Sequence, residues 1–216
     1  MLLSKIVNIA LRGWQQLADE GDIPIASDIP KYHVKDEVLR FFREIPKDNL
    51  RDRVLFDLTY RQGLRRREAA ELQLDQIDLA EKTIMVKRLK RSRSGVYELH
   101  DASIQLIRAY LTTLVANENP YLFPGRRTGS HISPTTVYYT CRKYARLAGL
   151  RRTNPHAFRH SCGVHAANAG LDLIDIADLL GHRSLATAMR YAAVSNKRRD
   201  ESHQRIVKSG EFAKTI

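Results

Sequence analysis

Along most of the chain the hydrophobic residues recur at spacings of three and four, which is the pattern of amphipathic helices. One such stripe begins at residue 35, a second follows the break at Pro46, and a short helix is predicted over residues 66–74. Beyond residue 100 helical spacing dominates, and we expect helices over residues 103–116, 133–148, 155–169, 173–180 and 184–192. Three glycines are placed to end helices: Gly149, Gly170 and Gly181.

Strand-like sequence occurs in one region. Residues 83–87 and 95–99 are short runs rich in β-branched and apolar residues, and residues 76–78 are a candidate third strand. The basic connection over residues 88–94 is then the tip of a hairpin. We therefore predict a mainly α fold with a small three-stranded antiparallel β-sheet.

The ends of the chain differ from its body. Residues 1–20 carry one isolated helical stripe, and residues 21–33 contain Pro24 and Pro30 without helical spacing, as expected for an extended linker. Residues 34–195 form the main predicted domain. Residues 196–216 are polar and charged with few apolar positions, and form either a frayed tail or a helix that docks elsewhere.

The charge balance favours a polyanionic partner. The chain has 36 Lys and Arg against 24 Asp and Glu, a formal net charge of +12. Nucleic acid is the leading candidate. An acidic membrane surface is the competing partner, but we find no long apolar run and no basic amphipathic helix with a bulky apolar face. With only Cys141 and Cys162 present, the sequence indicates no disulfide framework and favours a soluble, cytoplasmic protein.

Residues 154–191 concentrate the candidate chemistry. A helix that starts at Pro155 places His156 and Arg159 three residues apart on one face, where an imidazole and a guanidinium can converge on an anion. Downstream, His182 and Tyr191 each lie beside a short helical pattern. The spacing therefore predicts four polar side chains around one site.

These residues resemble a known family. The motifs are Gly63-Leu64-Arg65-Arg66-Arg67-Glu68, Lys90 in a hairpin, His156-x-x-Arg159, Leu180-Gly181-His182 and Tyr191. In this order and spacing they resemble the catalytic domain of the tyrosine recombinases, also called phage-type integrases, from about residue 34 to about residue 196. The run over residues 155–163 is similar to that of the small fimbrial phase-variation recombinases. The stripe over residues 4–19 resembles the last helix of the family's separate core-binding domain.

The resemblance implies a site-specific recombinase that cleaves and rejoins duplex DNA through a 3′-phosphotyrosyl intermediate, without metal or nucleotide cofactor. It also implies a homotetramer on two DNA sites, with a C-terminal element passed between neighbours, here the segment after residue 196. A monomer in solution is compatible with this. The implied catalytic set is Arg65, Lys90, His156, Arg159, His182 and Tyr191.

The chemistry of such a site can be stated from the residue types. A phenol has a pKa of about 10, so a tyrosine nucleophile needs help with its proton and with the charge on the phosphoryl oxygens. Two arginines can each make forked hydrogen bonds to those oxygens. We expect His156 to accept the Tyr191 proton or to orient the phosphate, and His182 to donate to a phosphate oxygen. By resemblance, Lys90 protonates the leaving hydroxyl.

Further DNA contacts are less determined by the sequence. Candidates are Arg88, Arg91 and Arg93 on the hairpin, and Arg142 and Lys143 on the helix over residues 133–148. A solvated charged surface is the alternative for each. No motif fixes the DNA sequence that is recognised, or separates integration from excision, inversion or dimer resolution.

Three rival hypotheses compete with this one. A type IB topoisomerase uses similar residues but relaxes supercoils, and a DNA-binding regulator would keep an inactive site. A zinc site is the third, because His156, His160, Cys162 and His165 lie close together in sequence. Zinc sites usually take ligand pairs from two separated segments, however, and no Cys-x-x-Cys partner is present. We expect His160 to hydrogen-bond within the site and Cys162 to pack as a small apolar residue.

Overall fold

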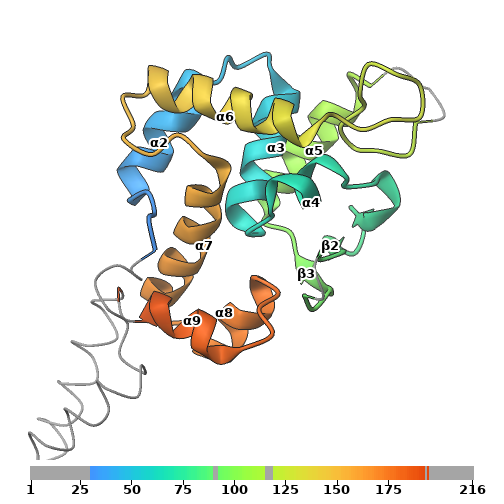
Figure 1. Ribbon diagram of the computed structural model, residues 1–216. Coiled ribbons are helices and arrows are strands. Elements are labelled where there is room, and N and C mark those ends of the chain that lie inside the picture. The colour runs from blue at the N-terminus through green and yellow to red at the C-terminus, as the bar shows by residue number, and fades with distance from the viewer. Residues whose placement is uncertain (1–29, 90–91, 115–118, 193, 195–216) are drawn as a thin grey trace, which may run out of the picture.

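The computed structural model describes residues 30–89, 92–114, 119–192 and 194 (Figure 1). Within this part the fold is mainly helical with one three-stranded antiparallel sheet, which confirms the predicted fold class. No helix in these residues is both long and apolar enough to cross a membrane. The helices are α2 (Lys35–Glu44), α3 (Leu50–Arg61), α4 (Arg66–Ala70), α5 (Asp101–Leu111), α6 (Pro134–Leu147), α7 (Pro155–Ala169), α8 (Leu173–Leu179) and α9 (Leu185–Ala192), and the strands are β1 (Ile77–Asp78), β2 (Thr83–Val86) and β3 (Gly95–Glu98).

Helix α3 lies at the centre of the main core, packed against α5 on one side and α7 on another (Figure 1). An aromatic cluster joins α2, α3 and α7. The ring of Phe41 lies 5.0 Å from that of Phe56 and 4.4 Å from that of Phe158, and all three side chains are fully buried. Burying a large aromatic side chain contributes about 1.5–3 kcal/mol. This cluster therefore fixes α7, which carries most of the candidate site, against the rest of the domain.

A second, smaller core lies at the far end of α7, where α8 and α9 pack (Figure 1). Its buried members include Val164 on α7, Ile176 on α8, and Ala188 and Tyr191 on α9. The candidate nucleophile is thus part of a packed core rather than a surface residue.

The sheet order is β1-β2-β3, with Ile84 paired to both Ile77 and Tyr97. Ile84 and Val86 point into the core, as the alternation of strand residues requires. The hairpin is held to the second core, because the Tyr97 hydroxyl donates to the Asp178 carbonyl oxygen at 2.8 Å.

Two predicted helices have different bounds. The helix predicted over residues 66–74 ends at Ala70, because the following residues pair with a distant loop: the Leu74 N–H donates to the Pro120 carbonyl, and the Leu122 N–H to the Leu72 carbonyl. The helix predicted over residues 103–116 starts at Asp101, because the His100 imidazole caps it, and ends at Leu111. The end of the first helix at Ala70 and the start of the second at Asp101 come from hydrogen bonds that hydrophobic spacing does not encode.

The expected domain limits fall largely outside the described residues. The helix at 1–20, most of the linker at 21–33 and the tail at 196–216 lie there, so these assignments stay predictions. The described end of the linker runs along α7, where the His33 N–H donates to the Ser161 hydroxyl at 2.8 Å.

Candidate active site

Helix α7 places three polar side chains towards the site. The Asn154 side chain caps the helix by accepting from the Ala157 N–H at 3.1 Å, and proline at the first helical position suits the free N–H groups there. His156, Arg159 and His160 follow within the first turns. The strong N-terminal signal in the sequence therefore fixes where these side chains emerge.

Arg65 is presented by a glycine turn between α3 and α4. Gly63 has φ +55°, and a Cβ there would lie 2.4 Å from the Leu180 side chain, so both its conformation and its packing require glycine. Glu68 then accepts from the Arg65 N–H at 2.8 Å and from Arg65 Nη1 at 2.6 Å. The backbone and the guanidinium of Arg65 are both held.

Glu68 is the buried carboxylate around which the arginines gather. Besides Arg65, it binds Arg88 at 2.9 Å and lies 3.9 Å from Arg159 Nη1. Burial alone would raise the pKa of Glu68, but the charge of Arg88 and the hydrogen bonds from Arg65 and Arg88 bring that pKa below its ordinary value. Glu68 therefore stays ionised and orients the positive groups of the site.

Arg88 does not fit the phosphate contact that the sequence suggested. Its side chain is 0% exposed and is paired with Glu68. Its guanidinium also donates to the carbonyl oxygens of Gln62, Gly63 and Leu179. Both terminal nitrogens of this buried cation are bonded within the protein, whereas Nε has no partner among the described residues. We therefore correct the assignment: Arg88 ties the hairpin to α3, α4 and α8.

Arg159 is also buried, but in a different setting. Its guanidinium donates to the carbonyl oxygens of Gly63 and Leu180. Burial, followed by the nearby charges of Arg65 and Arg88, lowers the pKa of Arg159 to about 10, which still leaves it protonated at neutral pH. A guanidinium has five N–H donors. The two carbonyl bonds orient Arg159 and leave donors for an anion.

Tyr191 lies against this group and is 1% exposed. Its hydroxyl is 3.0 Å from His160 Nδ1, and its ring is parallel to that of His182, at an angle of 10° and 5.9 Å between centroids. Burial, partly offset by the charge of Arg159, raises the pKa of Tyr191 to about 12. A Cβ at position 163 would lie 2.8 Å from the Tyr191 ring, so Gly163 permits this close packing.

His182 follows a left-handed glycine, Gly181 with φ +61°. Among the described residues its buried Nδ1 has no hydrogen-bond partner. Burial first, and then Arg159 and Arg65, lower the pKa of His182 to about 4. The ring is therefore neutral at pH 7.

His156 and His160 on α7 have different positions. Their rings meet edge to face with centroids 4.4 Å apart. Partial burial and the charges of Arg159 and Arg65 lower the pKa of His156, which solvent still reaches. In the described residues the ring that contacts the Tyr191 hydroxyl belongs to His160, whose pKa burial lowers to about 3. From the sequence we expected His156 either to accept the Tyr191 proton or to orient the phosphate.

The structure confirms the expectation that His160 hydrogen-bonds within the site, and its partner is the Tyr191 hydroxyl. The packing of Gly163 against Tyr191 was not assigned from the sequence. A signal was present, because a glycine inside a helix costs stability unless something packs closely on it.

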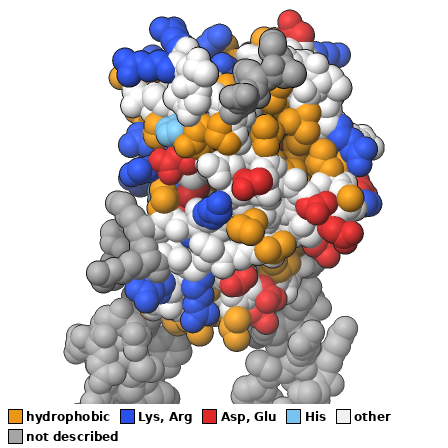
Figure 2. Space-filling model, turned by 90° about the vertical axis from the view of Figure 1, so that its right-hand side faces the viewer, with side chains coloured by type: hydrophobic (Ala, Val, Ile, Leu, Met, Phe, Trp, Pro, Cys, Tyr) orange, Lys and Arg blue, Asp and Glu red, His pale blue; other side chains and the backbone are white. Residues whose placement is uncertain are grey.

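The hairpin tip and α6 carry the remaining predicted DNA contacts. Lys90 and Arg91 lie outside the described residues, and Arg93 is exposed. On α6, Arg142 and Lys143 line a groove of about 570 Å³ on the outer surface of the helix. On the face shown in Figure 2 most basic side chains lie towards the left edge, and acidic ones mainly towards the centre and right.

The residues considered for a zinc site contact separate partners. Among the described residues, no group of three or more His, Cys, Asp or Glu side chains could hold a metal ion. The partners are the Tyr191 hydroxyl for His160, the Tyr60 hydroxyl at 2.8 Å for His165 and the Arg61 carbonyl at 3.5 Å for Cys162.

The sequence matches known proteins over the same region. Residues 31–198 match the model of the phage integrase family. Tyrosine recombinase XerA of Pyrococcus furiosus is 33% identical over 183 residues, which are 84% of this chain and 63% of the relative. Tyrosine recombinase XerC of Chlamydia pneumoniae is 32% identical over 180 residues, 81% of this chain and 57% of the relative. The expected likeness to fimbrial recombinases is untested by these matches and stays a prediction.

Solved structures agree on the fold. The crystal structure of XerA recombinase superposes with a TM-score of 0.71 at 23% identity and covers 82% of this chain and 65% of that one. XerH site-specific recombinase bound to a palindromic difH substrate, in a post-cleavage complex, gives a TM-score of 0.69 at 26% identity, with 81% and 53% covered. The chain thus spans about three fifths of the relatives that it matches.

Proposed function

Because the chain belongs to the phage integrase family, we propose that it breaks and rejoins duplex DNA through a covalent bond between Tyr191 and a 3′ phosphate. The observation that carries the proposal is the assembly of the site: Arg65, Arg159 and Tyr191 come from three separated segments. Both arginines reach the buried carboxylate of Glu68, and the charges of both act on the Tyr191 phenol. Two guanidinium groups that can each make forked hydrogen bonds, together with a phenol, suit a phosphodiester substrate.

The covalent bond between tyrosine and phosphate preserves the energy of the broken phosphodiester bond, so rejoining the strand needs no external energy source. The Tyr191 oxygen attacks phosphorus, the bond from phosphorus to the 5′ oxygen breaks, and the leaving oxygen takes a proton, which we assign to Lys90 by family resemblance. Arg65 and Arg159 stabilise the charge that develops on the non-bridging oxygens. His182 lies over the Tyr191 ring, where it can donate to one of these oxygens.

His160 and His156 have different roles at the Tyr191 hydroxyl. His160 contacts the hydroxyl, but a group with a pKa of about 3 is a weak base at neutral pH, so we assign it the orientation of the nucleophile. His156, which is more open to solvent and packs edge-on against His160, accepts the proton or orients the phosphate.

Covalent trapping on duplexes of randomised sequence tests this proposal whatever target the protein prefers. Each duplex carries a nick, so that a cleaved fragment diffuses away and the adduct persists. Denaturing gels and sequencing then report the adduct and its site. We expect an adduct with the native protein and none with Tyr191→Phe; no adduct with the native protein, or one that persists in the variant, refutes the assignment.

The same assay separates the rivals. An adduct with supercoil relaxation but without strand exchange identifies topoisomerase activity, and binding without an adduct identifies a regulator. Structures of relatives are described as complexes with DNA, which supports duplex DNA as the partner and hence a cytoplasmic place of action.

Assembly is the finer part of the proposal. Four protomers would act on two DNA sites and exchange the segment after residue 196, which lies outside the described residues. Deleting residues 197–216 should weaken assembly on DNA, measured by analytical ultracentrifugation, and leave thermal unfolding unchanged. A truncated protein that assembles and recombines normally contradicts the exchange.

A further inference from the structure

Three consecutive arginines surround the start of α4, and two of them have carboxylate partners. Arg65 pairs with Glu68 at 2.6 Å, and Arg67 pairs with Glu71 at 2.6 Å. Arg66 is exposed and makes no ion pair within the described part of the chain. The charge of Arg66 is therefore available to an anion from another molecule.

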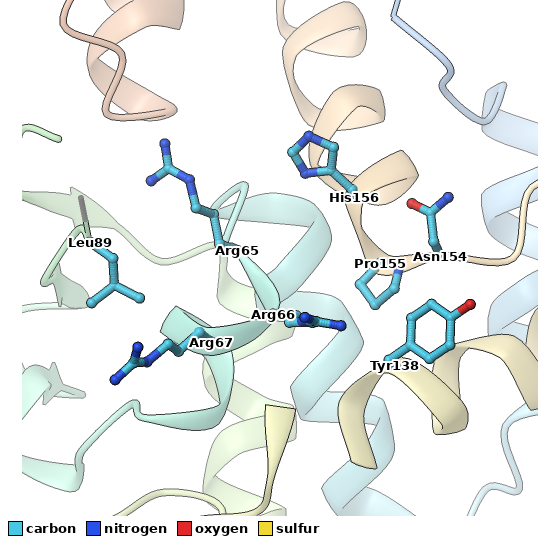
Figure 3. A pocket seen from close by; sticks show the side chains of 8 residues that line it. All are labelled: Arg65, Arg66, Arg67, Leu89, Tyr138, Asn154, Pro155 and His156. Carbon is cyan, nitrogen blue, oxygen red and sulfur yellow. The ribbon is translucent and has the colours of Figure 1, made fainter. Parts of the chain in front are cut away.

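Arg66 borders a pocket of about 580 Å³ next to the candidate active site. This is within the range of about 300–1,000 Å³ that ligand pockets occupy. Figure 3 shows Arg66 extending towards the side formed by Pro155 and Tyr138, whereas Arg67 extends away from that side. Leu89 forms another wall. The pocket thus joins an unpaired cation to apolar and aromatic surface.

We propose that this pocket holds the nucleotide adjacent to the scissile phosphate, with its phosphate on Arg66 and its deoxyribose against Leu89, Pro155 and Tyr138. The inference rests on the proposed function. Arg65 and His156 belong both to the active site and to this pocket, so a strand whose scissile phosphate binds Arg65 continues past Arg66.

The local field supports the same ligand. The N-terminal end of the 15-residue helix α7, with Asn154 and Pro155, also lines the pocket. The positive end of the helix dipole there favours an anion.

The first test measures how binding of a fluorescent duplex depends on salt concentration. Arg66→Gln should lower the magnitude of the log-log slope by about 0.9, the effect of one lost phosphate contact. Arg108→Gln, which removes an exposed arginine of α5, should leave the slope unchanged. Tyr138→Ala should weaken binding by the same factor at every salt concentration, whereas Tyr138→Phe should leave binding unchanged. Equal slopes for Arg66→Gln and Arg108→Gln overturn the proposal.

The second test places the contact on the DNA. In duplexes carrying the trapped site, each phosphate near the cleavage position is replaced in turn by an uncharged methylphosphonate. Native protein should bind less tightly when the phosphate next to the scissile one is neutralised, and Arg66→Gln should show no such loss there. An interference pattern for Arg66→Gln that matches the native pattern refutes this subsite. The native protein's own adduct reports separately on the proposed function.

Discussion

Replacing Glu68 by glutamine should destabilise the protein far more than the loss of one surface charge would. The carboxylate is 1% exposed, and its partner Arg88 is 0% exposed. Breaking a buried ion pair by removing one partner costs about 3–5 kcal/mol, because the remaining charge is left uncompensated. Carbonyl oxygens of Gln62, Gly63 and Leu179 still accept from Arg88, so we expect a loss towards the lower limit, about 3 kcal/mol.

Thermal and urea unfolding measure this loss directly. For a chain of this size, about 3 kcal/mol corresponds to a fall in Tm of about 6–12 °C. Glu71→Gln is the matched control, because it removes the same charge from an ion pair that is as short as Arg65–Glu68, 2.6 Å in both. The side chains of Arg67 and Glu71 are 66% and 28% exposed. An exposed pair contributes about 0–1 kcal/mol.

The pH dependence of the difference provides a second check. The folded pKa of Glu68 is lowered, so its ionised form contributes stability above the unfolded pKa of about 4.3, and this contribution is lost as the pH falls through the folded pKa. The difference between native protein and Glu68→Gln should be constant from neutral pH to about pH 5 and shrink below. Equal losses for Glu68→Gln and Glu71→Gln, or a difference that grows in acid, would refute the central role of Glu68.

Three further predictions concern packing, charge and acid sensitivity. Gly163→Ala should displace the Tyr191 ring, abolish covalent trapping and cost about 1–3 kcal/mol of unfolding free energy; normal trapping would contradict the packing. Arg88→Gln should lower Tm, measured in unfolding scans, with little direct effect on the salt dependence of DNA binding. Arg93→Gln should leave Tm unchanged and lower the magnitude of the salt slope, measured in salt titrations. Burial lowers the pKa of His33, so the native protein should lose stability as the pH falls below about 6.5, and His33→Leu should reduce that loss in urea titrations at pH 7.5 and 5.0.

Local sequence was enough for most of the fold because its helices are amphipathic and clearly terminated. The start of α7 was predicted at Pro155 from the proline, and the structure places it there. The hairpin strands were likewise predicted from short runs rich in β-branched and apolar residues, and the structure pairs them. Where a distant segment supplied the hydrogen bonds, as at Leu72 and Leu74 after α4, local pattern gave the wrong end.

The same limit applies to the site. Residue types and order brought Arg65, Arg159 and Tyr191 into one hypothesis, but the sequence could not show that Arg88 is buried, since a basic hairpin ordinarily faces solvent. Its burial depends on Glu68, which is 20 residues away, and on the Leu179 carbonyl, which is 91 residues away. Contacts at such separations leave no periodic signal along the chain.

The charge balance around Glu68 explains why this arrangement is suited to an anion. One carboxylate faces three guanidinium groups, from Arg65, Arg88 and Arg159, so 3 − 1 = 2 positive charges remain without a partner in this cluster. Burial and mutual repulsion are what lower the pKa of Arg159. A bound phosphodiester would relieve that repulsion, whereas a neutral ligand would not. Before any substrate binds, the guanidinium groups that Glu68 orients are therefore already arranged to favour phosphate.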